Sequence, residues 1–278
     1  MAVLLALCSA AAYGVGDFCG GLAARRTSTT TVVLWSHVLA LGLLVGAAPW
    51  VGGTASAHDL VLGGLGGLAG AAGVGLLYQG LSIGPMSVVA PVTALLSAAV
   101  PVAAGVVQGE RPSVGVVIGM AGALAAIVLV SAEGGGSLRP SDWRGLTFAL
   151  GAGLGFGLFF VALSHTGHSS GLWPLLAARA TSVTVGGGLV MARRISGSPP
   201  VGAEARRLTA GAGLLDITAN LLFLLAVRQG LLSVVSVLAA LYPVSTVVLA
   251  RLVLKERFAT LQRLGMLVAV PATILMAR

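Results

Sequence analysis

Residues 84–120 read GPMSVVAPVTALLSAAVPVAAGVVQGERPSVGVVIGM, and residues 230–266 read GLLSVVSVLAALYPVSTVVLARLVLKERFATLQRLGM. The two stretches align without a gap at an offset of 146 residues (230 minus 84), and Gly, Ser-Val-Val, Glu-Arg and Gly-Met recur in the same order. Chance accounts for one such match but hardly for four in order, so the pattern indicates a duplicated unit. Each stretch is apolar apart from the turn that contains Glu-Arg, as expected of two membrane spans joined by a short loop.

The composition is typical of a membrane protein. Of 278 residues, 57% are hydrophobic and 9% are charged, and the mean hydropathy is +1.01. A soluble domain has about 25% charged residues, because water must wet its surface. The net charge of +8 comes from short basic clusters between apolar runs, which indicates loops at an anionic lipid bilayer and not a nucleic-acid-binding surface.

Ten apolar stretches are each long enough to cross the hydrocarbon core, which takes about 20 helical residues. Their approximate bounds are 2–24, 29–50, 60–80, 84–108, 113–131, 144–165, 171–192, 208–228, 231–254 and 260–277. The segments between them are short, so no soluble domain is expected. We predict an all-α integral membrane fold with a five-helix repeat over residues 1–131, a linker over 132–142 and a second five-helix repeat over 143–278.

The odd number of helices in each repeat determines how the repeats are related. A unit of five spans ends on the opposite side of the membrane from where it begins, so the second copy is inserted inverted. Inverted repeats recur in secondary transporters, in which two near-equivalent halves rock around a site at the midplane. The sequence therefore predicts ten transmembrane helices in two inverted repeats and favours a transporter over a receptor or a scaffold.

Each repeat has a proline-containing span, a glutamate near the end of that span and a glycine in the next helix. These residues are Pro91, Glu110 and Gly119 in the first repeat and Pro243, Glu256 and Gly265 in the second. The first predicted helix contains an aromatic and glycine-rich stretch, YGVGDF over residues 13–18. With these features in register across both repeats, the chain resembles the EamA type of the drug/metabolite transporter superfamily over essentially its whole length.

The resemblance implies a secondary active transporter, an exporter or exchanger, that moves a small organic metabolite across the cytoplasmic membrane by alternating access. It implies amino acids, nucleobases, other metabolites or drugs as substrates. We expect a multi-pass monomer that does not use ATP directly, because the chain has no Walker motif. Two alternatives stay open: a membrane-embedded enzyme or lipid-handling protein, and a non-transporting partner subunit. The first needs clustered carboxylates or histidines at a membrane edge, and the second usually has a soluble domain or a long tail; the sequence offers neither.

No catalytic residues, metal site or cofactor site is predicted, and we expect no enzyme activity. The histidines have no metal-ligand spacing tied to carboxylates; they are His37, His58, His165 and His168. Glu110 and Glu256, at span ends beside arginines, are interpreted as structural residues that fix the turn between two helices.

Asp216 is the carboxylate closest to the centre of a span, and Asn220 lies one turn further on the same helix face. An ionisable residue at the bilayer centre is unfavourable by about 2.5–3.5 kcal/mol on insertion scales. Such a residue is therefore expected to have a partner or a function. In one interpretation Asp216 faces a central cavity and binds a substrate amine or a coupling proton. In the other it is permanently paired with Arg179. The two are compatible, because an ion pair can act as a gate.

Asp17 and Arg179 are the other charged candidates within spans. Asp17 is either a coupling residue or an interfacial carboxylate paired with Arg25 or Arg26. Arg179 either binds an anion or supports an aspartate or the carbonyls of a broken helix. Arg179 matches an arginine that is frequent in the second helix of an EamA repeat, and the first repeat has His37 at that place.

Four aromatic residues are candidates for the wall of a cavity: Tyr13, Tyr78, Tyr242 and Trp35. Aromatic residues in membrane proteins more often form belts at the membrane surface. Tyr242 fits that alternative least well, because it stands beside Pro243 in the middle of a predicted span.

The distribution of basic residues predicts an orientation. The connections after spans 1, 5, 7 and 9 contain eleven of them: Arg25, Arg26, Arg139, Arg144, Arg193, Arg194, Arg206, Arg207, Lys255, Arg257 and Arg263. The opposite side has three: Arg111, Arg228 and Arg278. The positive-inside rule then places both termini outside the cytoplasm, whereas the resemblance favours both inside; we give the local charges more weight.

Overall fold

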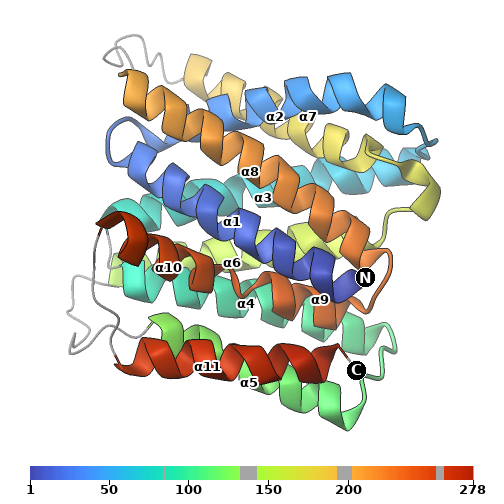
Figure 1. The fold of residues 1–278 in the computed structure, drawn as a ribbon. Helices are drawn as coiled ribbons and strands as arrows, with labels where there is room; N and C mark the ends of the chain where they lie inside the picture. The colour runs from blue at the N-terminus through green and yellow to red at the C-terminus, as the bar shows by residue number, and fades with distance from the viewer. Residues whose placement is uncertain (84–85, 132–142, 193–201, 255–259, 278) are drawn as a thin grey trace.

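A computed structural model describes residues 1–83, 86–131, 143–192, 202–254 and 260–277, and Figure 1 shows it as a ribbon. Within these ranges the regular elements are all helices, which confirms the all-α class. The predicted linker 132–142 and the glutamate Glu256 lie outside the described residues.

The helices follow the predicted spans closely. The first repeat contains α1 (Ala2–Ala24), α2 (Thr29–Val51), α3 (Ala57–Ile83), α4 (Met86–Val107) and α5 (Val114–Ser131). The second contains α6 (Trp143–Ser164), a short 3-10 turn η2 (His168–Ser170), α7 (Trp173–Ala192), α8 (Ala203–Val227), α9 (Leu232–Ala239), α10 (Tyr242–Leu254) and α11 (Thr260–Met276). By length and composition, α1 to α4 and α6 to α8 can each cross a membrane, and the remaining apolar helices of the described chain are shorter.

The ninth predicted span, 231–254, is not one helix but two. It is interrupted at Ala240 and Leu241, between α9 and α10. Pro243 explains the break: it has no N–H to donate to the carbonyl of Ala239, and its ring would collide with that carbonyl in a continuous helix. The equivalent span of the first repeat, α4, stays continuous although it contains Pro91 and Pro101.

The contact between α5 and α11 shows that the repeats are inverted. A Cβ placed on Gly119, early in α5, would lie 2.8 Å from the carbonyl oxygen of Ala272, late in α11. A Cβ on Gly265, early in α11, would lie 2.6 Å from the amide nitrogen of Val130, late in α5. The two helices are therefore antiparallel. Because Gly119 and Gly265 are equivalent at the offset of 146, the two repeats are related by an axis perpendicular to the helices.

The other helix contacts follow the same symmetry. α1 packs along α8 and α3 packs along α6, so the first helix of each repeat contacts the third helix of the other. Gly67 of α3 lies against the backbone of Ala178 in α7, and Gly213 of α8 lies against the backbone of Ser36 in α2. Gly213 is the equivalent of Gly67 at the repeat offset of 146 residues. Small residues allow this close approach between membrane helices. The resulting van der Waals packing favours helix association in lipid, where the hydrophobic effect does not.

Both chain termini lie at the same end of the bundle, on the right in Figure 1. We call this the terminal end; its connections are residues 52–56, 108–113, 165–172 and 228–231. At the opposite end the described residues include the turn 25–28 and the start of α8, joined by an ion pair between Arg26 and Glu204.

Candidate functional site

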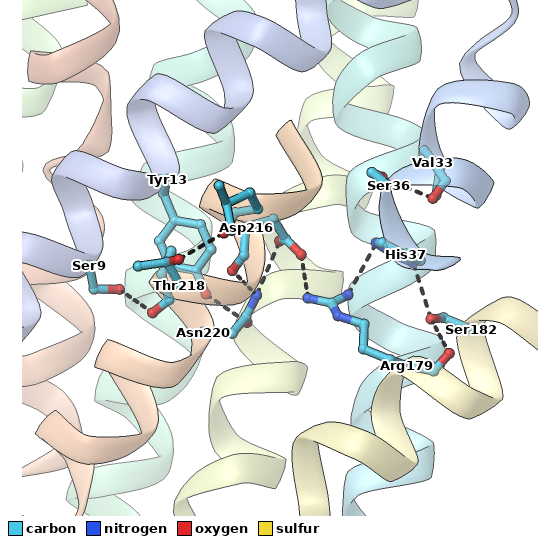
Figure 2. A network of polar contacts seen from close by, with 12 residues as sticks. Ser9, Tyr13, Val33, Ser36, His37, Arg179, Ser182, Asp216, Thr218 and Asn220 are labelled. Carbon is cyan, nitrogen blue, oxygen red and sulfur yellow. Dashed lines mark hydrogen bonds and ion pairs between the residues drawn. The ribbon is translucent and has the colours of Figure 1, made fainter. Parts of the chain in front are cut away.

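A continuous chain of polar contacts crosses the interior of the bundle, and Figure 2 shows it in close view. The hydroxyl of Tyr13 on α1 donates to Oδ1 of Asn220 on α8 at 2.8 Å. Nδ2 of Asn220 donates to Oδ1 of Asp216 at 3.1 Å and to the carbonyl oxygen of Asp216 at 2.6 Å. The other carboxylate oxygen of Asp216 forms an ion pair with Nη2 of Arg179 on α7. The sequence candidates on α1, α7 and α8 are thus brought together.

The chain continues from Arg179 to α2. Nη1 of Arg179 lies 3.1 Å from Nε2 of His37, and Nδ1 of His37 lies 3.1 Å from the hydroxyl oxygen of Ser182. That hydroxyl donates to the carbonyl oxygen of Arg179 at 3.0 Å. Because a guanidinium can only donate, Nε2 of His37 accepts and Nδ1 bears the proton. His37 is therefore a neutral imidazole held between an arginine and a serine, and it orients the Arg179 side chain.

Arg179 is almost completely buried, with 4% of its surface exposed. Its Nε has no hydrogen-bond partner within the described part of the chain. The pairing of Arg179 with Asp216, one of the two predicted roles for each residue, is present. A buried arginine with one unpaired donor still has capacity for an acceptor group.

Asp216 and Asn220 face the interior because of their spacing on α8. The exposed face of this helix runs through Leu214 and Thr218, and residues two positions away point in nearly the opposite direction. The Asp216 side chain nevertheless retains 18% of its surface exposed. The bundle is therefore not fully packed around this carboxylate.

Asp17 lies on the inward face of α1, as Asp216 and Asn220 do on α8. The exposed side of α1 runs through Leu4, Cys8 and Ala11, and Tyr13 and Asp17 lie half a turn away from it. Both are half-buried. Among the described residues Asp17 has no ion-pair partner. The pairing with Arg25 or Arg26, one of its two predicted roles, is not formed, and Arg26 pairs with Glu204.

The charges of the site do not balance. Gly16, the neighbour of Asp17, lies against the backbone of Asp216, so this region of the bundle holds two carboxylates, one guanidinium, that of Arg179, and a neutral His37. With both carboxylates ionised, the site has one negative charge more than positive charge. An uncompensated charge in a membrane interior is unfavourable, so the geometry suits one bound proton or one cationic group.

The tyrosines lie inside the bundle rather than at its surface. The ring of Tyr13 is 6.0 Å from that of Phe160, which stacks on Phe223 at 4.1 Å. Tyr78 and Tyr242 are buried, with 3% and 5% of their surface exposed. The Tyr242 hydroxyl donates to the carbonyl oxygen of Ala90 on α4 at 3.4 Å, and the Tyr78 ring lies against α1 at Gly20. Neither joins the polar chain directly.

Comparison with known proteins gives the family. The model of the EamA-like transporter family matches residues 1–132 and 143–278. The chain belongs to this family. It is therefore a multi-pass membrane protein of a family of transporters in the drug/metabolite superfamily.

Solved structures share the fold of this EamA-like chain. In all, 24 chains of known structure match. One of them, a crystal structure of a protein that is 18% identical, has a TM-score of 0.69, and the match covers 99% of this chain and 95% of that chain. At this identity the likeness concerns the fold alone. The comparison with curated proteins finds no match.

Three residues of the EamA-like site were not predicted from the sequence. Ser182 follows Arg179 by three positions, a spacing that places both on one helix face, so it was detectable. Phe160 and Phe223 were not, because apolar residues abound in every span. The described residues include no cluster of His, Cys, Asp or Glu that could hold a metal ion.

Proposed function

We propose that this EamA-like protein is a secondary active transporter that moves a small organic metabolite across the cytoplasmic membrane, as an exporter or exchanger, by alternating access. The proposal rests on the polar chain from Tyr13 to His37, which crosses helices of both repeats inside the bundle. Charged groups in the membrane interior are typical of substrate and ion pathways. A site shared by both halves changes when the halves move relative to each other.

The residues of the chain have separate roles in this proposal. Asp216 and Asn220 bind a polar group of the substrate, and Tyr13 with Phe160 forms an apolar wall beside it. Arg179 neutralises Asp216 while the site is empty. Asp17 accepts a proton or a cationic group, which makes protons the candidate coupling ion.

The repeat geometry supports alternating access. The two halves are inverted copies that pack through equivalent glycines, so an exchange of their conformations would open the site to the other side of the membrane. The break between α9 and α10 gives the second repeat a hinge at the depth of the site, where Tyr242 contacts α4 and the backbone of Gly14 in α1.

Transport into proteoliposomes tests the proposal. The purified protein is reconstituted, and uptake of labelled amino acids, nucleobases and other small metabolites is measured with and without a pH gradient. We expect at least one compound to accumulate above protein-free liposomes and to respond to the gradient. The matched control is Glu204→Gln, which removes an exposed carboxylate far from the site and leaves uptake unchanged. Uptake equal to that of empty liposomes for every compound would count against a transporter.

A further inference from the structure

The side chain of Glu110 connects the two repeats at the terminal end. Glu110 follows Gly109, whose φ of +88° is a left-handed conformation that favours glycine, and its amide nitrogen donates to the carbonyl oxygen of Gly105 at 2.9 Å. Its Oε1 accepts from the amide of Leu232 at 2.6 Å, and its Oε2 accepts from the amide of Ser233 at 3.0 Å. A turn after α4 of the first repeat is thus bound to the first residues of α9 in the second.

This contact supplies a cap that α9 lacks in its own sequence. The first N–H groups of a helix have no partner within the helix, and its N-terminus carries a partial positive charge. The N-cap residue of α9 is Leu231, which has no side-chain acceptor. Glu110 therefore caps α9 from the other repeat, and hydrogen bonds to a carboxylate are stronger than those between neutral groups.

The capped helix is short and is separated from α10 by a break. α9 comprises residues 232–239, all of them buried, and ends at the break before α10. Two of its hydroxyls, those of Ser233 and Ser236, are buried without a hydrogen-bond partner in the described ranges. These hydroxyls therefore add no hydrogen bond that would hold α9 in place, whereas Glu110 holds its N-terminus with two.

We propose that Glu110 is a gate residue that keeps the terminal end closed by holding the N-terminus of α9, and that transport requires this contact to break. The proposal rests on the alternating access proposed above. Release of α9 from Glu110 opens the seam between α4 and α9 from the terminal end, with the break at Ala240 and Leu241 as the hinge. Glu110 acts by positioning α9 and does not contact the substrate.

A thiol one turn inside the gate tests the proposal. Ser236 is fully buried, and Ser236→Cys is nearly isosteric. In a background with Cys8→Ser and Cys19→Ser, a membrane-impermeant maleimide is added from the terminal side, and the labelling rate is measured in proteoliposomes without substrate. Glu110→Ala should raise the rate about tenfold or more, because two hydrogen bonds to a charged group are lost. Glu110→Gln, which keeps one acceptor oxygen, should give a smaller increase.

Two controls separate opening of the gate from unfolding. Glu204→Gln removes a carboxylate from the opposite end and should leave labelling at position 236 unchanged. Val32→Cys, a fully buried position on α2, should stay unlabelled in the Glu110 variants. If the Glu110→Ala variant does not fold, the labelling rate at position 236 in the Glu110→Gln variant tests the proposal. The native labelling rate in Glu110 variants that are monodisperse and protected at position 32 would overturn the gate.

The labelling result is independent of whether transport is detected. Faster labelling at position 236 supports the gate even if no tested metabolite is taken up, in which case the proposed function fails separately. An unchanged rate in a protein that transports would reject the gate alone. An exposed thiol from Thr54→Cys, in a connection of the terminal end, identifies which face of the liposome the reagent reaches.

Discussion

Helices α3 and α8 hold the same place in the two repeats, yet only one of them contains charged groups within the site. Gly67 and Gly213 are equivalent and make the same contact, each against the second helix of the other repeat. One turn further on, the equivalence ends: Asp216 of α8 corresponds to Gly70 of α3 at the offset of 146. The first repeat has a packing residue where the second has a buried carboxylate.

The surroundings of these positions differ accordingly. A Cβ placed on Gly70 would lie 3.3 Å from the ring of Phe159, and Val74, the counterpart of Asn220, is 8% exposed in an apolar cluster. On α3, therefore, the space is filled by side-chain packing. On α3 and α8, the glycine shared by both repeats packs the helices together, whereas the positions that differ between the repeats contain the polar groups of the site. Four sets of substitutions test this division, taken from the largest expected effect on stability to the smallest.

The largest effect is expected for Asp216→Asn. The substitution leaves Arg179 buried without its counter-charge, and breaking a buried ion pair from one side is destabilising by about 3–5 kcal/mol. Expression and thermal unfolding in detergent should therefore both decline, and uptake in proteoliposomes should fall to the background level.

The double substitution Asp216→Asn with Arg179→Gln separates the two effects. Removing both charges should restore most of the lost stability, because no buried charge is left unpaired. Uptake should remain absent, since the charges that the substrate meets are gone. Recovery of transport in the double variant would assign the pair to stability alone, and native uptake with Asp216→Asn would remove Asp216 from the mechanism.

The shared glycines should give the next largest effect. In Gly67→Val and Gly213→Val, the added atoms meet backbone of α7 and of α2, and overpacking of this kind is destabilising by about 1–3 kcal/mol. Thermal unfolding should show similar losses for both, because the two contacts are symmetry equivalents. Gly42→Ala is the control, since no atom lies within 4 Å of a Cβ at this exposed position of α2. A loss confined to one of the two valine variants would contradict equivalent roles.

The fold was predictable largely because the repeat and the hydropathy are visible in the sequence. The ungapped offset of 146 residues and the odd number of spans were sufficient to predict inversion. The contacts of Gly119 with Ala272 and of Gly265 with Val130 confirm it. The break within residues 231–254 was not predicted. The described helices of the two equivalent spans contain three prolines, Pro91, Pro101 and Pro243, and only Pro243 stands at a break. The outcome therefore depends on the tertiary packing around each proline.

The site was predictable to the extent that its residues are polar within apolar spans. Asp216, Asn220, Arg179, His37 and Tyr13 stand out for this reason and are joined in the structure. Which carboxylate pairs with which arginine depends on helix rotation and crossing, and one sequence does not contain that information. The contact of Glu110 with α9 could not be predicted for the same reason, because its partners are backbone amides of another helix.

A smaller effect is expected for Tyr13→Phe, which removes one hydrogen bond to Asn220. A hydrogen bond of this type contributes about 0.5–1.5 kcal/mol, so unfolding should shift slightly and substrate affinity should weaken. Tyr78→Phe is the matched control, because among the described residues its hydroxyl donates no hydrogen bond to the polar chain. Equal changes in affinity for both variants would indicate general packing rather than a role of the chain that begins at Tyr13.

The smallest effect on stability is expected for Asp17→Asn, although its effect on transport should be large. α6, the counterpart of α1, has no carboxylate along its length, so Asp17 belongs to the asymmetric, polar part of the molecule. Because Asp17 has no ion-pair partner in the described ranges, its replacement by a neutral side chain of the same size removes no ion pair. The temperature of thermal unfolding should therefore stay unchanged or rise slightly.

The effect of Asp17→Asn on transport depends on what Asp17 binds. If Asp17 takes the coupling proton, uptake driven by a pH gradient should be lost while exchange of labelled for unlabelled substrate continues. If Asp17 binds a cationic group of the substrate, both uptake and exchange should be lost. Native gradient-driven uptake in a stable Asp17→Asn protein would show that the extra negative charge has no part in coupling, and the proposed site would then contract to Asp216, Asn220 and Arg179.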